Sequence, residues 1–168
     1  MNKTIITVAP TGSWTTKKNN PNIPFTPEEI AEDVYQSWKA GAAIAHLHMR
    51  DDNGNPTMDL ALFRETVKLI RGRCDIIINL TSTGDENATD EQRQIHLKEL
   101  LPEIATFNCG SMNWMHRGLL VNHPDFLRKL GMTMQEVKVK PELEIFDLGM
   151  IYNSLYYLNE GILKEPAH

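Results

Sequence analysis

Short apolar runs and amphipathic segments alternate five times along this chain. Runs rich in β-branched and apolar residues predict buried strands at residues 4–9, 42–51, 75–80, 104–108 and 137–146. Helical signals follow each run and predict helices at residues 26–40, 59–71, 89–101, 124–130 and 147–160. Regular alternation of strands and helices predicts an α/β fold with a parallel sheet, in a single domain spanning residues 1–168.

Some segments carry clearer signals than others. The first helix has a strong start, because Thr26 can cap it, Pro27 suits its first position and Glu29 completes a capping box. Residues 109–121 show no period and are predicted to be a loop, whose Met112, Trp114 and Met115 are interpreted as packing or subunit contacts. His96 is expected on a solvated helix face.

The second apolar run ends in three polar side chains at alternate positions, His46, His48 and Arg50. Residues two apart in a strand point to the same face, so these three would project together. Two imidazoles on one face predict a divalent metal, with zinc first, because neutral imidazole suits zinc and its neighbours. The alternative left open by the spacing is one satisfied core histidine beside one rim histidine.

Polar side chains also follow the other predicted strands. In parallel α/β folds the carboxyl ends of the strands meet on one face, where ligands bind, so these groups are expected to lie together there. They are Thr11, Ser13 and Trp14, then Thr81, Ser82 and Thr83, then Thr106, Asn108 and Ser111, and finally Glu142, Glu144 and Asp147.

The charge and composition of the chain argue against nucleic-acid binding and against a membrane protein. The chain has 17 basic and 22 acidic residues, a net charge of −5, which lacks the basic footprint of a nucleic-acid-binding protein. No apolar stretch is long enough to cross a membrane, and the apolar start is too short for a signal peptide. We therefore expect a cytoplasmic protein with reduced cysteines and no nucleic-acid or membrane partner.

Six ordered motifs resemble those of the β-keto acid cleavage enzymes, whose type member is 3-keto-5-aminohexanoate cleavage enzyme. The resemblance implies a zinc-dependent TIM (β/α)8 barrel. It also implies a reaction in which a β-keto acid and acetyl-CoA give acetoacetate and a new acyl-CoA. The motifs lie at residues 8–12, 40–44, 46–51, 78–81, 108–113 and 140–147.

The resemblance assigns roles position by position. His46 and His48 match the two zinc-binding histidines of the family, and Ser82 and Thr106 match its substrate-binding hydroxyl groups. The family's third zinc ligand, a glutamate, and its catalytic acid–base residues are expected beyond residue 168.

Further residues are expected at the substrate. Asp85 stands where the family usually has glycine and would add a charge at the substrate mouth. Trp14 replaces a glutamate that holds the amino group in the type member, which favours a more apolar or differently substituted keto acid. Arg50 is expected to bind a substrate carboxylate or to form a salt bridge, and Asn108 and Glu144 to contact substrate or orient the metal ligands.

The length of the chain sets a further expectation. A full barrel needs about 250 residues, so this sequence is expected to cover the first five βα units and to stop before strand six. A homo-oligomer is also expected. Two alternatives remain: a metal-dependent hydrolase of the amidohydrolase type, which places its His-x-His after the first strand, and a non-catalytic, metal-binding half-barrel.

Overall fold

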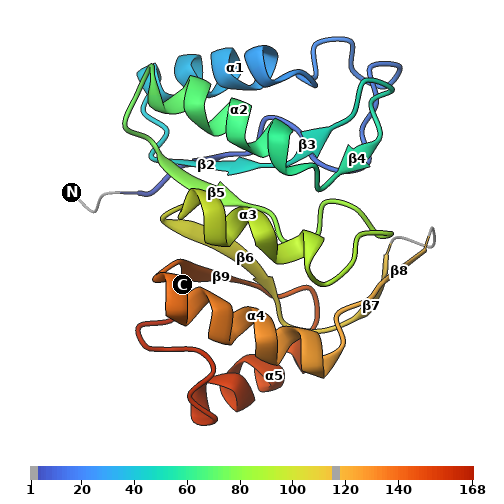
Figure 1. Ribbon diagram of the computed structural model, residues 1–168, viewed down its shortest axis with the longest axis vertical. Coiled ribbons are helices and arrows are strands. Elements are labelled where there is room, and N and C mark those ends of the chain that lie inside the picture. Colours follow the sequence, from blue (N-terminus) through green and yellow to red (C-terminus); the bar gives the residue numbers. More distant parts are fainter. Residues whose placement is uncertain (1–3, 115–117) are drawn as a thin grey trace.

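A five-stranded parallel sheet forms the centre of the structure, a computed structural model that describes residues 4–114 and 118–168. Its strand order is β1-β2-β5-β6-β9, so each strand is added beside the one before it (Figure 1). The strands are β1 (Thr7–Val8), β2 (Ile44–Leu47), β5 (Ile77–Leu80), β6 (Ile104–Asn108) and β9 (Lys140–Glu144).

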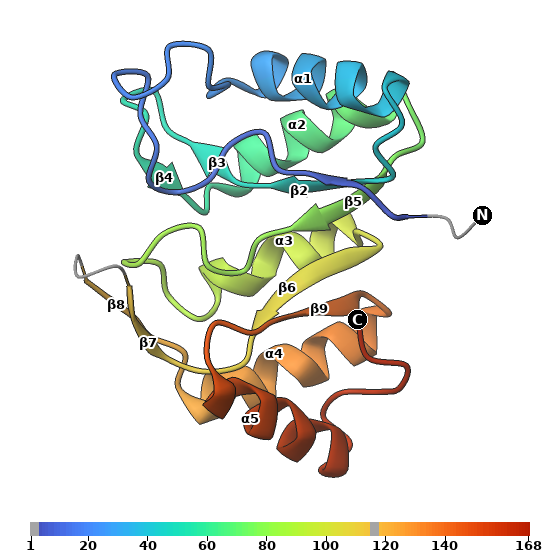
Figure 2. The same cartoon turned by 180° about the vertical axis from the view of Figure 1, so that it is seen from behind.

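Helices follow the strands and cover the outer side of the sheet. Figure 1 shows α2, α3 and α4 in front of the strands, and the reverse view in Figure 2 leaves β2, β5, β6 and β9 uncovered. This is the arrangement of the first five units of a (β/α)8 barrel, which confirms the predicted fold class. The helices are α1 (Pro27–Lys39), α2 (Leu60–Arg71), α3 (Gln92–Leu100), α4 (Pro124–Val137) and α5 (Leu148–Asn159).

Local signals place the helix starts. At α1 the Glu29 amide donates to the Thr26 hydroxyl and the Thr26 amide donates to the Glu29 carboxylate, both at 3.2 Å, so the predicted capping box is confirmed. At α5 the Asp147 carboxylate accepts a bond of 3.0 Å from the Met150 amide. In the described part of the chain, no helix is long and apolar enough to cross a membrane.

The core lies between the sheet and its helices. Phe63 of α2 and Phe107 of β6 are fully buried there, and every residue of β6 is buried. Burial on both faces is expected of a parallel strand covered by helices, but here it includes polar Thr106 and Asn108. These polar groups mark the end of the sheet at which the ligand site was predicted.

The first and fifth strands differ from their predicted bounds. Ile5 and Ile6, predicted to be buried, are 66% and 54% exposed, because β1 is an edge strand and pairs only with β2. The fifth strand begins at Lys140, since α4 runs on to Val137. The predicted run at residues 42–51 is also divided, because the strand breaks at His48.

Two antiparallel pairs were missed. Beyond the break, β3 (Met49–Arg50) pairs with β4 (Pro56–Thr57). The predicted loop at residues 109–121 contains a hairpin of β7 (Met112–Trp114) and β8 (Gly118–Leu120). Residues 115–117, and with them the interpretation of Met115, lie outside the described residues.

The expectation for His96 is wrong. Its side chain is fully buried, its Nε2 donates to the Thr81 carbonyl at 2.8 Å, and its ring stacks 4.4 Å from that of Phe63. His96 was predicted on the wrong side of α3 because the buried face of this helix is mainly polar and includes Arg93 and Gln94. Hydrophobic periodicity cannot reveal such a face.

Candidate active site

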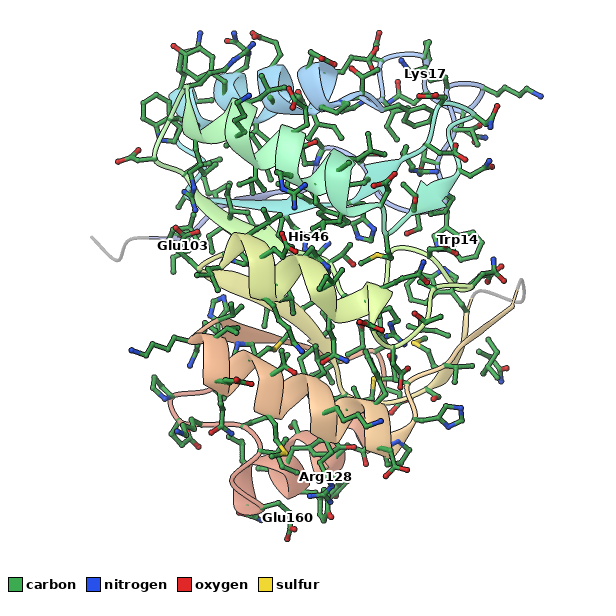
Figure 3. The ribbon with its side chains drawn as sticks, viewed as in Figure 1. Trp14, Lys17, His46, Glu103, Arg128 and Glu160 are labelled. Carbon is green, nitrogen blue, oxygen red and sulfur yellow. The ribbon has the colours of Figure 1, made fainter. Side chains whose placement is uncertain are left out.

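A cavity of about 750 Å³ opens at the carboxyl ends of the strands. Figure 3 shows Trp14 at the end of the molecule from which the hairpin projects, His46 near the centre and Glu103 at the opposite end. Of the nine residues predicted to bind metal or substrate, six line the cavity, namely Trp14, His48, Arg50, Asp85, Asn108 and Glu144, whereas His46, Ser82 and Thr106 do not.

The two histidines of the second strand converge on one point. Although the strand breaks at His48, the Nε2 atoms of His46 and His48 lie 3.0 Å apart. Two nitrogen ligands of a tetrahedral zinc ion, each at about 2.0–2.1 Å from the metal, stand roughly 3.4 Å apart. The two imidazoles therefore need only a small adjustment to share one ion.

Hydrogen bonds fix the tautomer of His48. Its Nδ1 lies 3.1 Å from the Ser13 hydroxyl, which in turn donates to the Gly84 carbonyl at 3.0 Å. Because the serine has one proton and a carbonyl can only accept, His48 must donate from Nδ1. Burial, with smaller effects of His46 and Arg50, lowers the pKa of His48 to about 3. The ring is thus neutral and presents the lone pair of Nε2.

His46 is also kept neutral but has more freedom. Burial lowers its pKa, while Glu142 and Asn79 act in the opposite direction. Its Nε2 can donate to the His48 lone pair, or its proton can move to Nδ1, which lies 4.0 Å from the Glu142 carboxylate. In the second tautomer two lone pairs meet, an arrangement that requires a cation between them, and the donor set fits a zinc ion.

Two carboxylates of β9 stand beside the histidines. Glu142 lies in register with Thr106, and Glu144 with Asn108. Asn108 donates its amide to Glu144, as Asn79 does to Glu142. Ligand atoms of His46, Glu142 and Glu144 lie within 4.8 Å of one another, so these three could hold a metal ion, whereas His48 is not part of this group among the described residues.

The electrostatics of Glu144 are unusual for a carboxylate. Burial raises its pKa to about 7, the Asn108 hydrogen bond lowers it, and the nearby Glu142 raises it further. Near neutral pH this group can therefore accept or release a proton at the wall of the cavity. A cation bound nearby would favour its charged form.

Ser82 and Thr106 are bonded to each other in the interior. Both side chains are fully buried, and neither lines the cavity in the part of the chain that the structure describes. The Ser82 hydroxyl donates to the Thr106 carbonyl at 2.9 Å, and the Thr106 hydroxyl accepts from the Ser82 amide at 2.9 Å. Their contact with substrate stays a prediction.

Arg50, predicted at a substrate carboxylate or in a salt bridge, holds two loops together. Its guanidinium donates to the carbonyls of Gly54 at 2.8 Å and Thr15 at 3.0 Å, and it is 4% exposed. No ion pair of Arg50 occurs among the described residues. Trp14 and Asp85 line the cavity.

Sequence reasoning missed several partners of the site. Ser13 was expected among the polar groups at the ligand face but without these partners, because its bonds to His48 and Gly84 cross 35 and 71 positions of the chain. Asn79 was read only as part of a strand. A side chain next to a predicted site residue, as Ser13 is next to Trp14, is the signal that could have found such partners.

Comparisons with known proteins show which sequences this chain is similar to. The model of the family described as beta-keto acid cleavage enzyme matches residues 3–168. A 3-keto-5-aminohexanoate cleavage enzyme of Fusobacterium nucleatum is 41% identical over all of this chain and 62% of its own length. A 3-dehydrocarnitine:acetyl-CoA trimethylamine transferase of Rhizobium meliloti is 35% identical over 99% of this chain and 63% of its own. The chain thus spans about three-fifths of these curated relatives.

Solved structures share the fold of this chain. The apo structure of ObcA superimposes with a TM-score of 0.79 at 28% identity, over 88% of this chain and 35% of that one. A ternary complex of ObcA with a C4-CoA adduct and oxalate gives a TM-score of 0.79 at 27% identity, over 92% of this chain and 38% of the other.

Proposed function

The chain belongs to the β-keto acid cleavage enzyme family, and from this we propose that the complete protein is a zinc-dependent acyltransferase. It would convert a β-keto acid and acetyl-CoA into acetoacetate and a new acyl-CoA. The bond between C2 and C3 of the keto acid and the acetyl–sulfur bond of acetyl-CoA both break. C2 forms a new bond to the acetyl carbon, and the released sulfur of coenzyme A takes the remaining acyl group. A cytoplasmic homo-oligomer is part of the same proposal.

The observation that carries the proposal is the convergence of His46 Nε2 and His48 Nε2, 3.0 Å apart at the carboxyl end of the sheet. These two nitrogens would hold the zinc ion, with a carboxylate as the third protein ligand. When bound, zinc supplies a Lewis-acidic charge that polarises carbonyl oxygens. Ser13 supports the site by keeping the His48 lone pair directed away from its own hydroxyl.

The remaining groups would bind and orient the substrate. Glu144, with a pKa raised to about 7, can hold or release a proton at the cavity wall, and Asn108 fixes the position of its carboxylate. Ser82 and Thr106, whose hydroxyl oxygens lie 3.2 Å apart, would hold the substrate carboxylate once one of them turns from its present partner. Arg50 supports this cavity through the loops that it joins.

The test is metal content together with acetyl-CoA-dependent formation of acetoacetate. We expect the wild-type protein to bind one zinc ion and the double variant His46→Ala/His48→Ala to lose both metal and activity. Ser82→Ala is the matched control and should keep its zinc while KM rises or kcat falls. Zinc stoichiometry that is unchanged in the double variant would contradict the site.

The same assay separates the alternatives. A metal-dependent hydrolase would act on its substrate without acetyl-CoA and would form no acyl-CoA. A non-catalytic metal-binding protein would hold zinc through His46 and His48 but turn over no β-keto acid. Transfer that depends on acetyl-CoA and is lost with the metal supports the proposed function against both.

A further inference from the structure

Two segments of the chain form neighbouring walls of the cavity. One is the turn after β5, residues 83–87, and the other is the end of the hairpin, residues 118–120. The two walls approach each other directly, because the Glu86 carboxylate lies 3.6 Å from the position that a Cβ atom of Gly118 would take. A group that joins these walls at their bases would therefore also set the space that a substrate can occupy.

One buried arginine joins the bases of both walls. Arg93 of α3 is 8% exposed, and its Nε donates to the carbonyl of Ser82, directly before the turn, at 2.7 Å. On the other side, directly after the hairpin, its Nη1 donates to the carbonyl of Val121 at 3.2 Å and its Nη2 to the side chain of Asn122 at 2.5 Å. All three nitrogens of the guanidinium thus donate to the two segments.

The bond from Arg93 to Ser82 does not depend on the hydroxyl groups of the site. The Ser82 amide donates to the Thr106 hydroxyl and the Ser82 hydroxyl donates to the Thr106 carbonyl, both at 2.9 Å. If the Ser82 hydroxyl turns to a substrate carboxylate, its bond to Thr106 breaks, whereas the bond from Arg93 to the Ser82 carbonyl remains. His96, one turn further along α3, holds the preceding carbonyl, that of Thr81, at 2.8 Å.

This inference rests on the proposed function, in which Ser82 binds the keto acid: we propose that Arg93 is a positioning residue for substrate binding. It keeps the Ser82 backbone in place while the hydroxyl turns, and it keeps the hairpin beside the turn. A lysine cannot replace it, because a planar guanidinium holds several acceptors in fixed directions and an ammonium on a flexible stem does not. The zinc site should be unaffected by its loss, since Arg93 bonds to neither His46 nor His48.

The test is the substitution Arg93→Lys in the complete, zinc-loaded protein, with 3-oxohexanoate and acetyl-CoA as substrates. We expect KM for 3-oxohexanoate to rise about tenfold, the size of one weakened hydrogen bond to a carboxylate. The values of kcat and of the zinc content should stay close to those of the wild type, because the lost interaction serves binding. A KM that stays within about twofold of the wild-type value would overturn the inference, whether or not kcat falls.

Two controls separate positioning from a general loss of stability. Leu97→Ala leaves a cavity beneath the same helix, because Leu97 is fully buried, but it removes none of the hydrogen bonds of Arg93. It should lower the amount of folded enzyme, and therefore the apparent kcat, without changing KM. Arg64→Lys is the same substitution at an exposed ion pair with Glu99 and should change neither constant. A rise in KM in either control as large as in Arg93→Lys would overturn the inference.

Hydrogen exchange tests the positioning without any turnover. In Arg93→Lys the amides of residues 81–87 and 118–122 should exchange faster than in Leu97→Ala, whereas those of β2 should not. If Arg93→Lys does not fold, Asn122→Ala removes one partner of the guanidinium and should speed exchange at residues 118–122 alone. Exchange in these segments that is no faster than in Leu97→Ala would overturn the positioning role.

The two measurements keep this inference apart from the function on which it rests. Faster exchange at both walls together with an unchanged KM would reject the role of Arg93 in substrate binding and keep the acyltransferase. Faster exchange at both walls, with a wild-type protein that turns over no β-keto acid, would keep Arg93 as the residue that positions the cavity walls and reject the proposed function.

Discussion

At the level of single residues, burial decides which imidazoles stay uncharged. His96 is enclosed between Phe63 and the Thr81 carbonyl, far from the solvent that would stabilise its charged form. Burial lowers its pKa from 6.5 to about 4, although bonds to the backbone at Thr81 and Gln92 oppose this. The folded protein therefore excludes a proton that the unfolded chain accepts between these two pH values.

This difference predicts a loss of stability in acid. As the pH falls below 6.5, the unfolded state binds a proton at His96 and the folded state does not, so the free energy of unfolding decreases until about pH 4. By pH 5 the loss from His96 should reach about 2 kcal/mol. Urea unfolding at pH 7.5 and pH 5, with chelator present to remove metal effects, measures it.

Two variants test the assignment to this residue. His96→Gln can still donate to the Thr81 carbonyl and should show a flatter dependence of stability on pH. His123→Gln changes an exposed histidine and should behave as the wild type does. The explanation fails if both variants have the pH dependence of the wild type.

At the level of elements, one buried cation joins the turn after β5 to the hairpin. Arg93 of α3 donates to the Ser82 carbonyl at 2.7 Å and to the Asn122 side chain at 2.5 Å, and its guanidinium lies 3.8 Å from the ring of Phe126. Burial lowers its pKa to about 10, so it stays charged at neutral pH. The side-chain amide of Asn122 in turn donates a hydrogen bond to the Gly110 carbonyl at 3.0 Å.

We expect Arg93→Lys to lower the free energy of unfolding by about 2–3 kcal/mol, because a lysine keeps the charge but loses the planar set of donors. Arg64→Lys is the control, since Arg64 forms an exposed ion pair with Glu99 and should change stability by less than about 1 kcal/mol. Thermal unfolding of the two variants measures the difference. Equal melting temperatures would show that the bonds of Arg93 contribute little.

The same elements show which parts of the fold and of the site could be predicted from the sequence. The order of strands and helices could be predicted from the periodicity of the apolar residues. The pairing of His46 and His48 could be predicted from their spacing of two. Both signals are local in the sequence. The hairpin was missed because β7 and β8 have three residues each, too few to establish an alternating pattern. The burial of His96 and the role of Ser13 depend on partners far along the chain, which no local pattern contains.

At the level of the whole molecule, apolar surface remains open. Along α5 a stripe of Leu148, Ile151, Tyr152 and Leu155 faces solvent, with exposed fractions from 44% to 77%. The outer edges of β1 and β9 also lack a paired strand of the described sheet. Surfaces and edges of this kind favour association with other chains.

The 168-residue chain expressed alone should therefore self-associate. Sedimentation velocity over a range of concentrations should show species larger than the monomer. Leu148→Lys/Leu155→Lys should reduce them by placing charge in the stripe, whereas Asn159→Lys, at an exposed position that is already polar, should not. A single monomeric species of the unmodified chain at every concentration would contradict this prediction.

The two hydrogen bonds of the Ser13 hydroxyl have a consequence for laboratory evolution. Through these bonds Ser13 joins its own loop to His48 and to Gly84, while the adjacent Trp14 and Asp85 line the cavity. Under the proposed function, substrate selectivity and metal binding would depend on different, neighbouring positions. A library randomised at residues 14 and 85, with Ser13 retained, should yield new acyl preferences among clones that still load zinc.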